Sequence, residues 1–313
     1  MNWKTFRYRC EYAALLGAAR LVPLLPRIAV VFLAQVAGAI ASVVDGRGRR
    51  VVLANLDCAF GKKYSPAEKR RILRQSYRHF AQTMFDLLWS PCLNERNFRR
   101  YVELENYPTT PDESAIIACF HYSNFEWLSL GCGFGGRSAT ILAQEFKNPL
   151  LDPVFRRLRE QSGHVFTART GGILRLYKTL RRGGNTALLV DLTIPPSEEA
   201  VAIECFGMQT SVTAAHAWLH QRTGGALIPA YCEPLARGRY RIVFHPRIEL
   251  PPDATMRQVA QACWDSFEPV VRNNPAPWLW MYKHWRYQPA KADRPYPFYA
   301  SVRPRFDRMI AGS

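Results

Sequence analysis

The feature that most constrains the fold is an alternation of apolar runs and helical patterns that begins at residue 115. The expected strands are 115–120, 138–143, 187–191, 226–232 and 240–245. The expected helices are 124–131, 149–162, 172–182, 211–223 and 255–272. Alternation of this kind is typical of an α/β domain, in which helices flank a central sheet.

A histidine stands at the carboxyl end of the first expected strand. The apolar run 115–120 is followed by His121, and Glu126 comes five residues later. Sites in α/β sheets lie beyond the carboxyl ends of strands, and Asp191 ends a second apolar run in the same way. Histidine can take a proton near pH 7, and a carboxylate within reach can orient its ring and stabilise the imidazolium. The pattern indicates a general base, His121, with Glu126 as its orienter; a capping or core histidine is the alternative.

Three other motifs have structural interpretations. A G-x-G-x-x-G match at 131–136 follows an expected helix and precedes a strand, which is the reverse of a dinucleotide site, so it is interpreted as a turn. His216 and His220 have zinc-ligand spacing without an evident third ligand, so we expect no metal. No G-x-S-x-G elbow is present, which argues against a serine hydrolase.

The charge of the chain is strongly positive, with 42 Lys and Arg against 25 Asp and Glu and a net charge of +17. Such a surface attracts nucleic acid, anionic lipid headgroups or an acidic protein. The cations are spread along the chain, and no helix-turn-helix, RRM or zinc signature accompanies them, so nucleic acid is not the expected partner. The eight cysteines include no C-x-x-C pair, which is typical of a reduced, cytosol-facing protein.

Residues 21–44 form a mostly apolar stretch with basic residues on both sides. This stretch could span a membrane, act as a signal peptide, dip into one leaflet or form a buried helix. We take 1–45 as a membrane-associated helical segment. Ser65 and Glu68 form a capping box with Pro66 between them, which predicts a helix that ends near Trp89. The tail from Pro289 is expected to be irregular.

Six segments between residues 10 and 288 together resemble the late acyltransferases of lipid A biosynthesis, the lauroyl/myristoyl transferase family, within the wider lysophospholipid acyltransferase group. The segments are 49–56 with Phe60, 121–126, 148–152 with Arg159 and Gly163, 182–191, 206–210, and 278–286. The chain departs from the family pattern at Leu192 and Cys205, and in the amino-acid sequence of its last segment.

The resemblance implies a glycerolipid acyltransferase-like α/β fold over 46–290, with a mixed central sheet flanked by helices, followed by the irregular tail 291–313. It implies a membrane-associated O-acyltransferase at the cytoplasmic face of the inner membrane. Acyl carrier protein or CoA would supply an acyl thioester, with no other cofactor, and a hydroxyl of a lipid A precursor or related (lyso)lipid would accept the chain. Substrate contacts are implied for Asn148, Arg159, Asp191, Phe206 and Gly207. The alternative is a non-catalytic basic protein that binds anionic membrane lipid on a degenerate acyltransferase scaffold.

Overall fold

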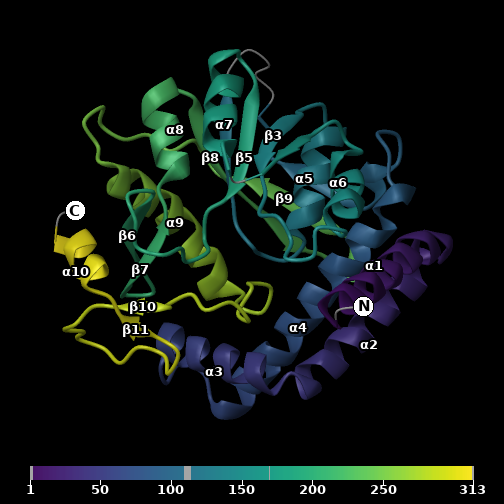
Figure 1. The fold of residues 1–313 in the computed structure, drawn as a ribbon, viewed down its shortest axis with the longest axis horizontal. Helices are drawn as coiled ribbons and strands as arrows, with labels where there is room; N and C mark the ends of the chain where they lie inside the picture. Colours follow the sequence, from purple (N-terminus) through teal and green to yellow (C-terminus); the bar gives the residue numbers. More distant parts are fainter. Residues whose placement is uncertain (1–2, 109–113, 169, 312–313) are drawn as a thin grey trace.

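A mixed seven-stranded sheet forms the centre of the computed structural model, which describes residues 3–108, 114–168 and 170–311 (Figure 1). The strand order is β1-β9-β8-β2-β5-β3-β4. β8 and β9 are antiparallel, and the other neighbours are parallel. The strands are β1 (Val102–Glu105), β2 (Ala115–Cys119), β3 (Ala139–Leu142), β4 (Val165–Thr167), β5 (Asn185–Leu189), β8 (Ala226–Pro234) and β9 (Tyr240–Phe244).

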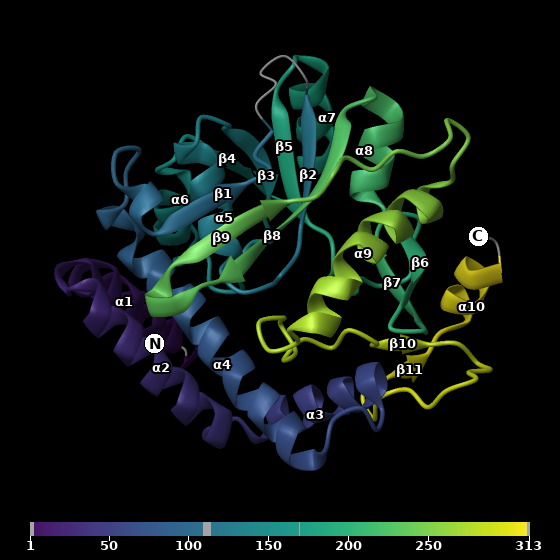
Figure 2. The same ribbon diagram turned by 180° about the vertical axis from the view of Figure 1, so that it is seen from behind.

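Helices cover both faces of this sheet, so the predicted α/β architecture is confirmed. Ile116 and Ala118 of β2 face a core with α7, α8 and α9, whereas Ile117 and Cys119 face a core with α5 (Figure 2). The alternation follows from the two-residue period of a strand buried on both faces. These helices are α5 (Phe125–Phe134), α6 (Asp152–Glu160), α7 (Gly172–Arg181), α8 (Ala215–Thr223) and α9 (Met256–Asn273).

The N-terminal helices pack along one side of the α/β domain (Figure 1). They are α1 (Trp3–Leu21), α2 (Arg27–Val44), α3 (Gly46–Phe60) and α4 (Pro66–Trp89). The capping box of α4 is present as predicted. α2 lies against α4 through a face of small residues, and a Cβ added at Gly38 would stand 2.5 Å from the Arg78 backbone. The close approach of the two helices therefore requires glycine at this position.

The opposite face of α2 carries apolar side chains that point away from the protein. Its exposed members are Ile28, Phe32, Leu33, Val36, Ile40, Val43 and Val44. Among the described residues, α2 is the one helix long and apolar enough to cross a membrane, and 22% of it is buried inside the protein. By itself this is weak evidence, because core helices of soluble proteins and signal sequences meet the same criteria.

Two parts of the C-terminal third differ from the sequence prediction. The predicted helix 211–223 begins only at Ala215, because residues up to 213 belong to β7 (Met208–Thr213), which pairs with β6 (Ala200–Cys205). The prediction of an irregular tail is wrong in part. β10 (Tyr287–Gln288) pairs with β11 (Ser301–Val302), and α10 (Pro304–Ala311) follows. Phe306 of α10 is fully buried in a small apolar cluster with Ala202 and Tyr287, which explains why the tail is ordered.

A buried carboxylate connects α2 to the start of α5. Asp86 of α4 is fully buried and forms a bidentate ion pair with Arg27, at 2.5 and 3.1 Å. It also accepts hydrogen bonds from the Tyr240 hydroxyl at 2.6 Å and from the Asn124 amide at 2.8 Å. Asn124 is the N-cap of α5, since its side-chain oxygen accepts a hydrogen bond from the Trp127 backbone N–H. Asp86 thereby holds the turn that presents the residues after β2.

Asp86→Ala is expected to lower the free energy of unfolding by about 3–5 kcal/mol, because it leaves Arg27 buried without its carboxylate. Urea unfolding in detergent followed by circular dichroism measures the change. The matched control is Asp57→Ala, which removes an ion pair with Lys69 whose carboxylate is 64% exposed. That loss should stay within about 1 kcal/mol. Equal losses for the two variants would contradict the role given to Asp86.

Candidate active site

His121 and Asp191 meet because their strands are neighbours in register. β2 and β5 are parallel, and Cys119 pairs with Leu189, so the residues two positions later lie side by side at the carboxyl edge of the sheet. His121 Nδ1 lies 2.8 Å from Asp191 Oδ1, and the His121 backbone N–H donates to Asp191 Oδ2 at 3.0 Å. Both positions were expected at strand ends, and the structure joins them into one pair.

Asp191 is held as a carboxylate. Burial by itself raises its pKa, but the charge and hydrogen bond of His121 and the hydrogen bond from Trp278 outweigh burial and place the pKa below its usual value. Trp278 Nε1 donates to Asp191 Oδ2 at 2.8 Å. An ionised Asp191 accepts the Nδ1–H of His121, which leaves Nε2 as the basic nitrogen of the ring.

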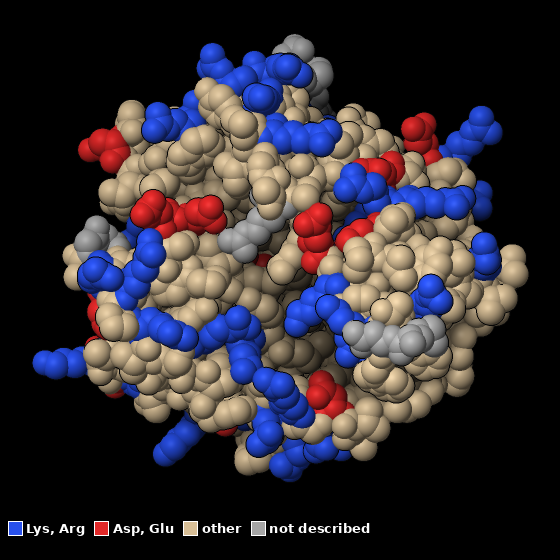
Figure 3. Space-filling view, viewed as in Figure 1, with Lys and Arg blue, Asp and Glu red and all other residues tan. Residues whose placement is uncertain are grey.

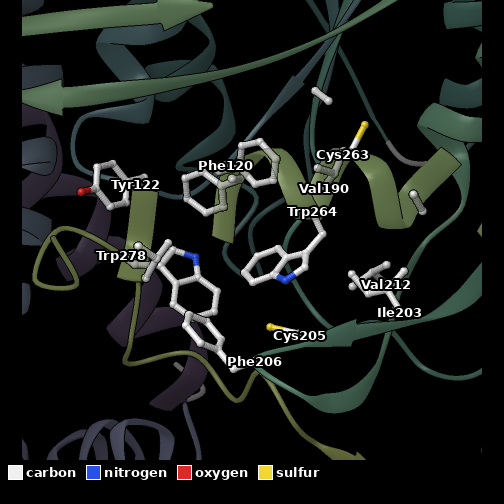
Figure 4. Close-up of a cluster of buried hydrophobic side chains, with 14 of the residues drawn as sticks. Phe120, Tyr122, Val190, Ile203, Cys205, Phe206, Val212, Cys263, Trp264 and Trp278 are labelled. Carbon is white, nitrogen blue, oxygen red and sulfur yellow. The ribbon is translucent and has the colours of Figure 1, made fainter. Parts of the chain in front are cut away.

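A second histidine, His284, packs against the indole ring of Trp278 that contacts Asp191. The ring of His284 stacks on Trp278 with centroids 3.9 Å apart, and its Nε2–H donates to the Leu279 carbonyl. Burial lowers the pKa of His284 to about 4, so this ring is neutral near pH 7. Figure 4 shows the indole of Trp278 among buried aromatic side chains, beside Phe206 and Trp264. The sequence marked residues 278–286 as a family segment without indicating that Trp278 contacts the carboxylate.

Glu126 has a different partner from the one expected. Arg159 Nε donates to Glu126 Oε2 at 2.9 Å, and Nη2 donates to Oε1 at 2.5 Å. Glu126 lies in the first turn of α5, and its side chain is 5% exposed, against 18% for Arg159. The expectation that Glu126 orients His121 therefore differs from the observed contacts, because the carboxylate at Nδ1 belongs to Asp191.

An apolar cavity of about 750 Å³ adjoins both pairs. His121, Glu126 and Arg159 line it, and most of its remaining wall is apolar. The apolar wall residues include Phe80, Met84, Ile117, Phe125, Leu128, Ile141, Phe146, Phe155, Phe166, Ile173, Leu189, Leu192, Trp218, Met256 and Leu279. Figure 3, which has the orientation of Figure 1, shows a hollow near the middle of the molecular surface with Lys and Arg side chains beside it. The site can hold a long apolar group next to a base.

Four residues expected to contact substrate, Asn148, Asp191, Phe206 and Gly207, lie outside the residues that line this cavity, and Asp191 meets it only through His121. Asn148 is buried, and its amide donates to the Tyr8 carbonyl and to Glu11, which fixes α1 against the domain. Phe206 and Gly207 form the turn between β6 and β7, and Phe206 is buried in the aromatic core. Among the described residues, no group of three or more His, Cys, Asp or Glu could hold a metal ion.

The family model for bacterial lipid A biosynthesis acyltransferases matches residues 3–287. The chain belongs to this family. No curated protein gives a significant match. As a lipid A biosynthesis acyltransferase, the protein uses an acyl donor and a lipid acceptor, and proteins of this family are membrane-associated. The match ends at the first residue of β10, so β11 and α10 lie beyond it.

Proposed function

We propose that the protein transfers a fatty acyl chain from a thioester of acyl carrier protein or CoA to a hydroxyl of a lipid A precursor or a related lysolipid. The observation that carries this proposal is the His121–Asp191 pair at the wall of a large apolar cavity. The cavity volume lies within the range of small-molecule and cofactor sites, and its wall suits the hydrocarbon chain.

In this mechanism His121 is the general base. Its Nε2 takes the proton of the acceptor hydroxyl while the oxygen attacks the thioester carbonyl carbon. The new C–O ester bond forms, the C–S bond breaks, and the imidazolium returns the proton to the leaving thiolate. Asp191 holds the ring and stabilises the imidazolium through Nδ1.

The Glu126–Arg159 pair places a guanidinium at the cavity wall. Glu126 engages Nε and Nη2, which fixes the plane of the group. The guanidinium carbon lies over the rings of Phe155 and Phe166, 5.2 and 5.6 Å from their centroids, in cation–π contacts. A fixed cation that lines the same cavity as the base favours the negative charge that develops on the thioester oxygen. We therefore assign Arg159 to charge stabilisation and Glu126 to positioning Arg159.

Mass spectrometry of the lipid product tests this function. Purified protein in detergent with an acyl-carrier-protein thioester and a lipid A precursor should give a lipid one acyl chain heavier. Acyl-CoA in place of the carrier protein shows which donor serves. Vesicle binding without any product from either donor would contradict the proposal and favour the non-catalytic scaffold.

We further propose that α2 lies flat in the membrane interface and does not cross the bilayer. Its small-residue face is packed on α4, and Arg27 at its first turn is paired with the buried Asp86. A spanning helix would have to leave both contacts. The exposed apolar side chains and the basic residues near α2 suit an interface of acyl chains and anionic headgroups.

Ile28→Ser, Phe32→Ser and Ile40→Ser combined should release most of the protein from membranes, especially at high salt. Each side chain contributes about 1.5–3 kcal/mol when buried in lipid, and all three point away from α4. Sedimentation with membranes measures the effect. Leu174→Ser with Val165→Ser, two exposed positions elsewhere, is the control. If the triple variant still sediments like the wild type, another surface holds the membrane.

A further inference from the structure

The C-terminal segment, residues 289–311, lies against the β6–β7 hairpin. In both ribbon views α10 stands beside β6, and the paired strands β10 and β11 lie near the end of the hairpin (Figure 1 and Figure 2). The family match ends at residue 287, so the contacts of this segment come from the part of the chain beyond the match.

The main contact of the segment is apolar and comes from α10. Phe306 is fully buried in one small cluster with Ala202 of β6 and Tyr287 of β10. Successive residues of a strand point to opposite faces, so Ile203, the next residue of β6, belongs to the main core instead. The hairpin is therefore packed on both faces, and the C-terminal segment supplies one of these packing surfaces.

Two polar side chains of the segment hold the backbone of the hairpin. Tyr296 donates its hydroxyl hydrogen to the Gln209 carbonyl of β7 at 2.9 Å. Arg294 donates from Nη1 to the Phe206 carbonyl in the turn, and from Nη2 to the Cys58 carbonyl of α3, both at 3.0 Å. A single guanidinium group thereby connects the turn of the hairpin to α3.

The base of the same hairpin forms part of the cavity wall. The Ile194 backbone N–H donates to the Ser211 carbonyl at 3.0 Å, and Ser211 pairs with Ala202 in the hairpin. The Ala214 backbone N–H donates to the Glu199 carbonyl at 2.8 Å. The contact of Phe306 with β6 is thus one strand pair and one hydrogen bond away from the cavity. The wall residues at this base are Ile194, Glu198, Glu199, Thr213 and Ala214.

α10 also reaches one of these wall residues directly. Arg305 Nη2 lies 3.7 Å from Glu198 Oε1. The Glu198 side chain is 97% exposed, so water screens this ion pair and its contribution to stability is small. Burial of the Phe306 ring removes a large apolar surface from water, so this apolar contact should dominate the position of the hairpin.

We propose that the C-terminal segment positions the β6–β7 hairpin and thereby sets the shape of the cavity wall that binds substrate. Phe306 and Arg294 are then positioning residues for acyl transfer, although neither is among the residues that line the cavity. This inference rests on the acyl transfer proposed above and adds residues that determine substrate binding. Release of the hairpin should weaken binding at its base, while the His121–Asp191 pair keeps its geometry through the register of β2 and β5.

Phe306→Ala should raise the KM of the lipid acceptor or of the thioester about 10-fold and change kcat less than about 3-fold, because the wall shifts while the base stays in place. Each KM is measured with the other substrate saturating. Hydrogen–deuterium exchange should become faster in the hairpin, residues 200–213, and stay unchanged in α5. Phe306→Leu, which keeps a large apolar side chain, should restore most of both effects.

Arg294→Gln provides a second variant that does not depend on burial. Arg294 is exposed, so its replacement should leave the protein folded even if Phe306→Ala does not fold. The loss of its hydrogen bond to the Phe206 carbonyl should raise the same KM about 3-fold, as expected for one hydrogen bond.

Phe98→Ala is the matched control for Phe306→Ala. Phe98 is also buried, but it belongs to the core cluster on the other face of the sheet. Its loss should lower the overall stability and leave both KM values and the exchange of the hairpin as in the wild type. Equal increases of KM in Phe98→Ala and Phe306→Ala would attribute the effect to general destabilisation and overturn the inference.

Unchanged KM values in both Phe306→Ala and Arg294→Gln would also overturn the inference, without affecting the proposed function. Absence of product from the wild-type protein would overturn the proposed function instead. The exchange measurement needs no substrate, so an unchanged hairpin in Phe306→Ala would overturn the positioning role by itself.

Discussion

His121→Ala is expected to lower the rate of acyl transfer by about 10²–10⁴-fold, the usual contribution of a general base. The substitution removes the nitrogen that takes the acceptor proton, while the apolar cavity and the Glu126–Arg159 pair remain. Initial rates at saturating thioester and acceptor measure the loss. Because the His121 ring is near the surface of the cavity, with 11% of the side chain exposed, the fold should be kept.

His220→Ala provides the matched control. His220 lies on α8, and its ring contacts only the Gly225 carbonyl among the hydrogen bonds of the described residues. That variant should transfer acyl chains at nearly the wild-type rate. A folded His121→Ala protein with wild-type turnover would show that another group takes the proton.

Asp191→Asn should be almost as damaging, with kcat lowered by about 10²–10⁴-fold. An amide keeps the size of the carboxylate but loses the charge that stabilises the imidazolium, and its NH₂ group can hold His121 in the wrong tautomer. Glu126→Gln should have the smaller effect on kcat, because its carboxylate is bonded to Arg159. Measuring kcat for both variants separates the two carboxylates. A larger loss of kcat for Glu126→Gln than for Asp191→Asn would contradict this assignment and favour Glu126 as the residue that orients His121.

The strands that the sequence predicts well are the long apolar ones at the centre of the sheet. β2 is buried at every position, and strands buried on both faces are continuous apolar runs. β4 has only three residues, and the β6–β7 hairpin carries Thr, Ser and Gln on its second strand. Such short or polar strands depend on pairing with neighbours rather than on their own pattern. The ordered tail depends in the same way on a tertiary contact, that of Phe306.

Local sequence patterns predict which residues lie at the candidate site but not which of them contact one another. Positions at strand ends indicated that His121 and Asp191 belong to one edge of the sheet. Which carboxylate meets His121 is decided by the register of β2 with β5, over a separation of 70 residues. The partner of Glu126 is 33 residues away on α6, beyond the reach of any helical or strand period. Asn148 and Phe206 were expected at the site from the family resemblance alone, whereas their observed contacts stabilise the fold.

We propose that His121 and Asp191 act as one catalytic unit, and a double-mutant cycle on kcat tests this proposal most directly. Groups that act as a unit have strongly non-additive effects on the rate. We expect Asp191→Asn to lower kcat severely in the wild-type enzyme and to add no further loss in His121→Ala. If Asp191→Asn lowers kcat by the same factor in both backgrounds, the two residues act independently, which contradicts a joint catalytic role for them.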